Sequence, residues 1–273
     1  MSVLHAIVLG IVQGLSEFFP ISSSAHLELT RRLFGWEELS GELETSFDVA
    51  VHLGTLVGAI AYLRADIAKY LVAGLAPLRR RPLTNDGRVG WFLVASAAPA
   101  GLVGVALADQ IDNLEGTAAI AVVLIVFGLL LLLADRMPER RGRDEFTLRD
   151  ALLMGVGQAL ALQPGVSRSG AALTVSRLLG FERDAAVRLV FLMSLPVIAG
   201  AGLFSLLTAD IPPSFRAPFL SGAATSAVTG WVAVWGMLRL VRRHSFTPFV
   251  WYRVILGLGV LGILAASMST TAS

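Results

Sequence analysis

The sequence predicts an all-α, polytopic membrane protein with six transmembrane helices and two re-entrant helical hairpins, arranged as an inverted-topology repeat. Composition is the first observation, because 55% of the 273 residues are hydrophobic and only 15% are charged, whereas soluble domains carry about 25% charged residues. The second is that six apolar stretches are long enough to cross a bilayer. The third is a polar hairpin motif that occurs twice, 145 residues apart.

The composition also excludes several classes of protein. A mean hydropathy of +0.72 argues against a soluble domain, a disordered chain or a coiled coil. The chain has no cysteine, so it has neither a disulfide framework nor a thiolate nucleophile. Its formal net charge is only +2, so we expect no nucleic-acid partner.

The six transmembrane helices are expected at the longest apolar stretches, 47–63, 89–108, 117–134, 185–207, 217–238 and 246–266. Pro99 and Pro196 are expected to kink two of them, which neighbouring helices of a bundle can accommodate. The first basic residue is Arg31, so the apolar stretch before it lacks the basic flank of a secretory signal peptide. We therefore expect that stretch to belong to the folded domain.

Two further apolar stretches, 3–15 and 151–162, are too short to span a bilayer. Each runs into a Pro- and Ser-rich break, at 20–24 and 164–170, and then into a short helix-like segment, at 25–34 and 171–179. Non-helical backbone at membrane depth survives only where protein buries it or where it lines a wet cavity. We therefore expect two re-entrant hairpins. The alternative is a pair of amphipathic hairpins at the membrane surface.

The two hairpins resemble each other when the chain is shifted by 145 residues. The shift pairs Gln13 with Gln158, Ser22 with Ser167, Ser24 with Ser169, Arg32 with Arg177, and Gly35 with Gly180. Matches of this kind in one register indicate an internal duplication. We expect a single membrane domain over 1–273, built from repeats at about 1–135 and 146–273.

The charges of the connections predict the orientation. The connections at 64–88, 135–149 and 239–243 hold 14 Lys or Arg residues, whereas those at 36–46, 109–116 and 209–216 hold one. The positive-inside rule places the basic connections in the cytoplasm, with Arg31 and Arg32 as exceptions near the outer face. Three spans per repeat is an odd number, so the repeats must be inverted, with a site expected where the broken helices meet.

The first hairpin carries the residues best suited to catalysis. Gln13 and Glu17 are four apart and share a helix face. Because an ionisable residue inside an apolar segment is costly, Glu17 is a functional-site hypothesis. The alternative is a carboxyl that only pins its own loop. His26 falls in the first turn of the following helix, where a neutral imidazole could carry a proton, or it is a packed, hydrogen-bonded His. Hydroxyls come from Ser22, Ser23 and Ser24, of which one is expected to cap the helix.

The second hairpin predicts an anion site. Gly165, Ser167, Arg168 and Ser169 lead into a helix whose N-terminus presents backbone N–H groups. Arg168 adds a forked, permanently charged donor suited to phosphate. The alternative is a structural ion pair between Arg168 and Glu17. A further i,i+4 pair, Asp48 and His52, either lines the same cavity or is structural. We favour the structural role, because the two side chains can satisfy one another.

Together the hairpins supply a carboxylate, an imidazole, hydroxyls, an arginine and two helix N-termini. This set fits hydrolysis of a phosphate anhydride carried by a lipid, because phosphoryl transfer needs charge neutralisation, a nucleophile and a proton carrier. Residues 14–26, with their Glu, Ser-rich loop and His, resemble a motif of the undecaprenyl-diphosphate phosphatase (bacitracin-resistance protein) family. Residues 164–169 resemble its Pro-Gly-x-Ser-Arg-Ser motif.

The resemblance covers essentially the whole chain and implies several properties. The expected activity is removal of the terminal phosphate of undecaprenyl diphosphate, which recycles the lipid carrier for peptidoglycan synthesis and confers bacitracin resistance. A bacterial plasma-membrane location, a site that opens to the outer side, a homodimer and a divalent cation (Mg²⁺ or Ca²⁺) with Glu17 as ligand are implied as well. The implied catalytic residues are Glu17, Ser23, His26 and Arg168, and the implied substrate-binding residues are Gln13, Ser22, Gly165, Ser167 and Ser169.

The chain departs from the family pattern at two positions. Gln13 stands where many members have Glu, which weakens the case for a metal held by paired carboxylates. Ala172 stands at the position of a Thr, and Thr174, two residues on, points elsewhere on the helix. From the sequence, Ser23 is either the nucleophile or a residue that orients water. The alternative functions are a polyprenyl-phosphate lipid or anion transporter built on the inverted repeat and, further off, a Ser–His intramembrane protease.

Overall fold

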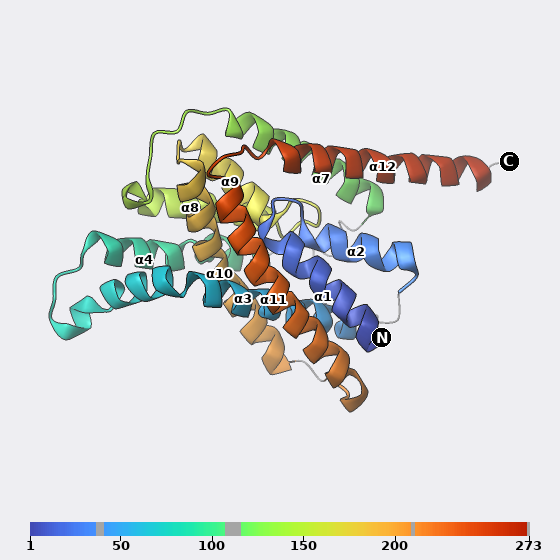
Figure 1. The fold of residues 1–273 in the computed structure, drawn as a ribbon, viewed down its shortest axis with the longest axis horizontal. Helices are drawn as coiled ribbons and strands as arrows, with labels where there is room; N and C mark the ends of the chain where they lie inside the picture. Colours follow the sequence, from blue (N-terminus) through green and yellow to red (C-terminus); the bar gives the residue numbers. More distant parts are fainter. Residues whose placement is uncertain (37–40, 107–115, 209–210, 272–273) are drawn as a thin grey trace.

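The computed structural model describes residues 1–36, 41–106, 116–208 and 211–271. The regular elements in these ranges are all helical (Figure 1). The α-helices are α1 (Val3–Phe18), α2 (Ser23–Phe34), α3 (Glu42–Gly74), α4 (Asn85–Ala95), α5 (Ala97–Ala106), α7 (Thr117–Asp135), α8 (Leu148–Leu160), α9 (Arg168–Leu178), α10 (Arg183–Thr208), α11 (Arg216–Leu240) and α12 (Thr247–Thr271). Short 3-10 turns lie at Ala76–Arg79, Arg143–Glu145 and Pro213–Phe215.

Six helices in the described chain are long and apolar enough to cross a membrane, counting α4 and α5 as one. They coincide with the six predicted spans, which confirms that part of the prediction. The segments predicted as hairpins form the pairs α1–α2 and α8–α9. Residues 107–115, at the end of the second predicted span and in the loop after it, lie outside the described residues, as do 37–40, 209–210 and 272–273 in other predicted connections.

Local sequence explains several helix ends. The Ser2 hydroxyl caps α1 by accepting a hydrogen bond from the His5 amide, 3.1 Å away. Helix α8 begins with a capping box between Thr147 and Asp150. Pro99 has no N–H, and α4 ends at Ala95, four residues before it, with α5 resuming at Ala97. Pro196, by contrast, lies inside a continuous α10.

The helices pack in an interleaved order that brings distant parts of the chain together (Figure 1). Helix α1 lies along α11, which also packs against α3, while α12 lies along α7 and α8 packs against α5. Gly10 allows the close approach of α1 to α11, because a Cβ at this position would overlap the Gly222 carbonyl. Each hairpin thus packs against a helix from the other half of the chain.

The main hydrophobic core surrounds α10, the most buried of the six long helices. Phe191 of α10 is fully buried and meets Phe18, the last residue of α1, in an edge-to-face contact with ring centroids 5.1 Å apart. This contact anchors the C-terminal end of α1 in the middle of the protein. The residue immediately before Phe18 is Glu17.

Candidate active site

The first break places two polar side chains against each other. Helix α1 ends at Phe18 and α2 begins at Ser23, so Glu17 occupies the last turn of one helix and Ser23 the first position of the next. The turn between them requires an unusual backbone, because Ser22 has a φ of 73°. Non-glycine residues rarely adopt this region, and such residues cluster at functional sites.

The second break has the same form. Ser167 has a φ of 71° and caps α9, with its hydroxyl accepting a hydrogen bond from the Gly170 amide at 3.1 Å. Arg168 is the first residue of α9. The two breaks touch, because the Ser169 hydroxyl donates a hydrogen bond to the Phe19 carbonyl at 3.0 Å.

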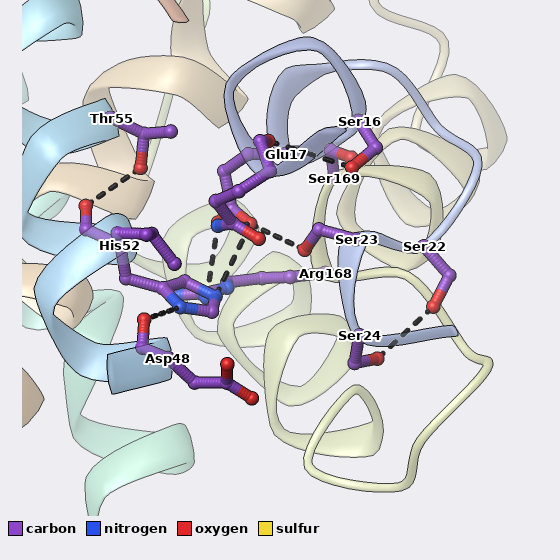
Figure 2. A network of polar contacts seen from close by, with 12 residues as sticks. Ser16, Glu17, Ser22, Ser23, Ser24, Asp48, His52, Thr55, Arg168 and Ser169 are labelled. Atoms are coloured by element: carbon purple, nitrogen blue, oxygen red, sulfur yellow. Dashed lines mark hydrogen bonds and ion pairs between the residues drawn. The ribbon is translucent and has the colours of Figure 1, made fainter. Parts of the chain in front are cut away.

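Glu17 lies at the centre of the contacts between the hairpins (Figure 2). Its Oε1 is 3.1 Å from Nη2 of Arg168. Its Oε2 accepts hydrogen bonds from Ser23 Oγ at 2.6 Å and from Gln13 Nε2 at 3.0 Å. The carboxylate side chain is only 4% exposed. We call Gln13, Glu17, Ser23, Arg168 and His52, described next, the Glu17 network.

His52 completes the network from α3 (Figure 2). Its Nε2 is 3.4 Å from Oε2 of Glu17, and its Nδ1 is 2.7 Å from the backbone carbonyl oxygen of Asp48. Since the carbonyl and the carboxylate both only accept hydrogen bonds, the ring satisfies both contacts when each nitrogen carries a proton. The carboxylate therefore faces the Arg168 cation and a hydrogen-bond donor on the imidazole.

The expectation that Asp48 and His52 satisfy one another was wrong for their side chains. The Asp48 carboxylate instead pairs with Arg31, which also contacts Glu44 at 2.8 Å. The i,i+4 spacing does bring His52 near Asp48, but only its backbone oxygen is used. Tertiary packing of α3 directs the ring toward Glu17.

The structure places His26 outside the Glu17 network. Its Nδ1 contacts the Ser22 carbonyl oxygen and its Nε2 contacts the Tyr252 hydroxyl, both at 2.7 Å. Because the carbonyl only accepts, Nδ1 carries a proton, and Nε2 shares a hydrogen bond with the Tyr252 hydroxyl. The two contacts fix the orientation of the imidazole on the first turn of α2.

The remaining predicted binding residues lie in the breaks. Ser22 and Ser24 pair through their hydroxyls at 3.2 Å, and Ser167 and Ser169 pair in the same way at 3.3 Å. Gly165 has a φ of 93°, in the left-handed region that favours glycine. Since these hydroxyls are already engaged, backbone N–H groups in the first turn of α9 remain the better anion donors.

A cavity of about 680 Å³ opens beside the Glu17 network. Its polar lining includes Ser24, His52 and Arg168, and its apolar lining includes Ile120 and Ile198. Arg31 and Arg32, the two basic residues predicted near the outer face, line it too. A mixed polar and apolar cavity of this size suits an anionic head group attached to a lipid.

The site has few side chains that could coordinate a metal ion. No cluster of three or more His, Asp or Glu side chains that could hold an ion occurs in the described chain. The donor chemistry nevertheless fits a hard cation, because the buried Gln13 Oε1 has no hydrogen-bond partner and lies on the helix face of Glu17. Mg²⁺ is commonly held by one or two protein oxygens plus substrate phosphates.

The sequence did not identify two contacts near the site. His52 does line the cavity, which was the less favoured alternative to a local pair, but its contact with Glu17 was not predicted. Arg253 of α12 received no role although it is a buried cation within an apolar span. The signal for Arg253 was present, because an ionisable residue inside a transmembrane segment is itself a functional hypothesis.

Comparison with known proteins identifies close relatives. Residues 6–259 match the family model described as "Bacitracin resistance protein BacA". An undecaprenyl-diphosphatase of Geobacter metallireducens is 46% identical over 267 residues, covering 96% of this chain and 98% of the relative. That of Geobacter sulfurreducens is 47% identical over 272 residues, covering 97% and 100%. That of Thermomicrobium roseum is 44% identical over 279 residues, covering 97% and 99%.

Proposed function

Because the chain belongs to the bacitracin resistance protein BacA family, we propose that the Glu17 network is where it hydrolyses undecaprenyl diphosphate to undecaprenyl phosphate and inorganic phosphate. The activity follows from the family and from relatives named undecaprenyl-diphosphatase that are 46% and 47% identical. It recycles the lipid carrier for peptidoglycan synthesis and confers the resistance for which the family is named.

One observation carries the assignment of the site: a single carboxylate touches both a hydroxyl and an arginine. Ser23 Oγ lies 2.6 Å from Glu17 Oε2, and Arg168 Nη2 lies 3.1 Å from Glu17 Oε1. A nucleophile within hydrogen-bond reach of a base, which a third group orients, is the usual arrangement for covalent catalysis. The arginine beside it supplies the charge that a transferring phosphoryl group requires.

In the proposed reaction, Arg168 and the N-terminal N–H groups of α9 bind the terminal phosphate, together with Gly165, Ser167 and Ser169 of the second break. Ser23 Oγ attacks the terminal phosphorus, Glu17 takes the hydroxyl proton, and the bond to the bridging oxygen breaks to release undecaprenyl phosphate. Water then attacks the phosphoserine, Glu17 returns its proton to Ser23 Oγ, and phosphate is released. His26, whose ring contacts the Ser22 carbonyl, carries away the proton that the attacking water loses. Gln13 orients the Glu17 carboxylate.

A divalent cation, Mg²⁺ or Ca²⁺, is part of the proposal. Glu17 and the free Oε1 of Gln13 would hold it, and when bound it would neutralise phosphate charge. We expect Gln13→Glu to remain active and to bind the cation more tightly, since it adds a second hard oxygen ligand. Divalent-cation titration of the activity of both proteins measures this. A Gln13→Glu protein that is inactive at saturating cation would contradict the assignment of Gln13 and Glu17 as ligands.

The hairpins are proposed to be re-entrant and the halves to be inverted repeats. The matching Ser22 and Ser167 backbones support this, with φ of 73° and 71°. The packing supports it too, because α1 lies against α11 and α8 against α5, so each hairpin contacts the second span of the other half. The third spans of the halves, α7 and α12, also pair with one another.

The site is proposed to open to the outer side of the bacterial plasma membrane. The basic bias of the connections predicts that 84–88 and 139–143 are cytoplasmic and that 36–44 and 271–273 are outside. In this cysteine-free chain, Glu42→Cys should react with an impermeant thiol reagent in intact cells, and Asp86→Cys only after permeabilisation. Labelling at residue 86 from outside would overturn the orientation.

The resemblance also supports a homodimer in the membrane. The molar mass of the detergent-solubilised protein, measured by light scattering with the detergent subtracted, should be twice the 29.0 kDa of one chain. A mass of one chain across the working concentration range would contradict a stable dimer.

Purified protein and a polyprenyl diphosphate test the function directly. We expect the wild-type protein to release inorganic phosphate and Ser23→Ala to release almost none, with phosphate trapped on Ser23 in rapidly quenched wild-type reactions. The transporter alternative is not favoured, because the relatives are named for a phosphatase activity. Movement of the lipid without phosphate release would reverse that preference.

A further inference from the structure

Arg253 of α12 is a fully buried cation that touches both breaks. Its Nη1 donates a hydrogen bond to the Pro20 carbonyl at 3.2 Å, in the first break. Its Nη2 donates to the carbonyls of Gly165 and Val166 in the second break, at 3.1 and 3.0 Å. Its Nε donates to the Leu124 carbonyl of α7 at 2.9 Å. One guanidinium therefore joins α7, α12 and the two breaks.

The surrounding helices leave room for this side chain. Gly170 on α9 faces the guanidinium, and a Cβ there would lie 2.9 Å from Nη1 of Arg253. On α7, Gly128 lies beside the aliphatic part of Arg253, with a built Cβ 3.4 Å from the arginine Cβ. Helices α7 and α9, from different halves of the chain, thus each have a glycine where they contact the Arg253 side chain.

Stability alone is a weak reason for such a residue. All four hydrogen bonds of Arg253 in the described chain go to backbone carbonyls, and no carboxylate there pairs with it. Burying a charge costs several kcal/mol even in favourable cases, and apolar replacements of buried ionic groups are often neutral. Ionisable residues inside membrane segments are instead typically functional.

Resting on the proposed function, we propose that Arg253 is a positioning residue that fixes the two breaks relative to one another and thereby holds Ser23 and Arg168 at the reacting phosphate. Ser23 lies three residues after Pro20, and Arg168 two residues after Val166. Movement of the first break would therefore shift the nucleophile Ser23, and movement of the second break would shift Arg168, which binds the phosphate. Misplacement by about 1 Å can cost about 10²-fold in rate.

Arg177 provides a matched control. It is equally buried and also donates to backbone carbonyls, those of Asp135, Met137 and Phe181, but it lies on α9 and its Nε is 3.5 Å from the Asp135 carboxylate. Its contacts are at the far end of α9 rather than at the breaks. Arg177→Lys should therefore cost stability without changing the relation between the hairpins.

Two measurements on the same proteins test the proposal. We expect Arg253→Lys, which keeps the charge but cannot reach four carbonyls with one planar group, to lower kcat about 10²-fold with KM little changed. Spin labels at Leu33→Cys and Leu178→Cys, exposed positions on α2 and α9, report the relation between the hairpins. Their distance distribution should shift or broaden in Arg253→Lys and stay unchanged in Arg177→Lys.

The outcomes separate this inference from the proposed function. A wild-type protein that releases no phosphate would refute the function, while the spin-label comparison would still decide whether Arg253 couples the hairpins. If Arg253→Lys leaves either the distance distribution or kcat unchanged, or if Arg177→Lys alters both equally, the positioning role is overturned. Should Arg253→Lys fail to fold, Gly170→Ala keeps Arg253 but displaces its guanidinium, and it should alter the same distance distribution.

Discussion

Ser22 and Ser167 occupy equivalent places in the two breaks and share a left-handed backbone, with φ of 73° and 71°. Each precedes a helix, and each pairs its hydroxyl with that of the serine two residues on, at 3.2 and 3.3 Å. The backbones of the two hairpins are therefore nearly the same at the breaks, and the difference between them lies in the side chains that follow.

Those side chains differ in a complementary way. The shift of 145 residues that pairs the breaks also pairs Ser23 with Arg168, each the first residue of its helix. Both contact the same carboxylate, Glu17, whose own counterpart is Leu162. The first hairpin thus brings a hydroxyl to the Glu17 carboxylate, and the second hairpin brings a cation.

The largest loss of rate is expected when Arg168, which distinguishes the second hairpin from the first, is replaced. Arg168→Lys keeps the charge but loses the two-point contact with phosphate, and removal of one such donor typically costs about 10²–10³ in rate. Steady-state kinetics with purified protein measures the loss. A near-normal kcat would mean that Arg168 is only a structural partner of Glu17.

Replacing Glu17, the carboxylate that only the first hairpin carries at this position, should lower the rate by a similar factor. Glu17→Gln keeps the shape and loses the base, so kcat should fall at least about 10²-fold. Moving the carboxylate to the other hairpin, with Glu17→Leu and Leu162→Glu together, should not restore turnover. Activity in that transposed protein would show that the hairpins are interchangeable and that the division of roles is incorrect.

Replacing the two equivalent glutamines should have different effects, on stability at Gln158 and on rate at Gln13. Gln13 donates to Glu17, whereas both amide atoms of the buried Gln158 lack a partner in the described chain. An unsatisfied buried polar group costs about 1–3 kcal/mol. Gln158→Met should therefore leave the melting temperature unchanged or raise it, with normal activity, while Gln13→Met should lower kcat. Loss of activity in a stable Gln158→Met protein would assign that amide a function.

The smallest effect concerns the breaks themselves. Glycine adopts a positive φ freely, so Ser22→Gly should stabilise the fold by up to about 1 kcal/mol. Ser167→Gly relieves the same strain but removes the hydroxyl that caps α9, which offsets part of the gain. Thermal unfolding of both variants compares them. Equal stabilisation would mean that the Ser167 cap contributes nothing.

The sequence predicts the six spans and the two short helix pairs well, because both depend on local properties. Apolar length locates the spans, and the Pro- and Ser-rich breaks locate the hairpins. The contact between Glu17 and Arg168 was also anticipated as an alternative, since a lone carboxylate and a lone arginine within otherwise apolar hairpins have few other charged partners.

Tertiary packing decides the rest of the site. His52 had a plausible local partner in Asp48, and only the placement of α3 shows that its ring meets Glu17 instead. His26 is close to Ser23 in sequence, but three residues along a helix rotate it to face Tyr252 of α12, which no local pattern reveals. Arg253 could have been identified from its charge within an apolar span. The four backbone carbonyls that accept its hydrogen bonds could not have been predicted from the sequence.

The central claim is that Glu17 and Arg168, from different hairpins, act on the phosphate as one unit. The most direct measurement is kcat for Glu17→Gln, for Arg168→Lys and for the protein with both changes, each confirmed as folded by its melting temperature. Residues that act as a unit are strongly non-additive, so the double variant should be nearly as active as the slower single variant. Losses that multiply, to about 10⁴-fold or more, would show that the two residues act independently and would contradict the account.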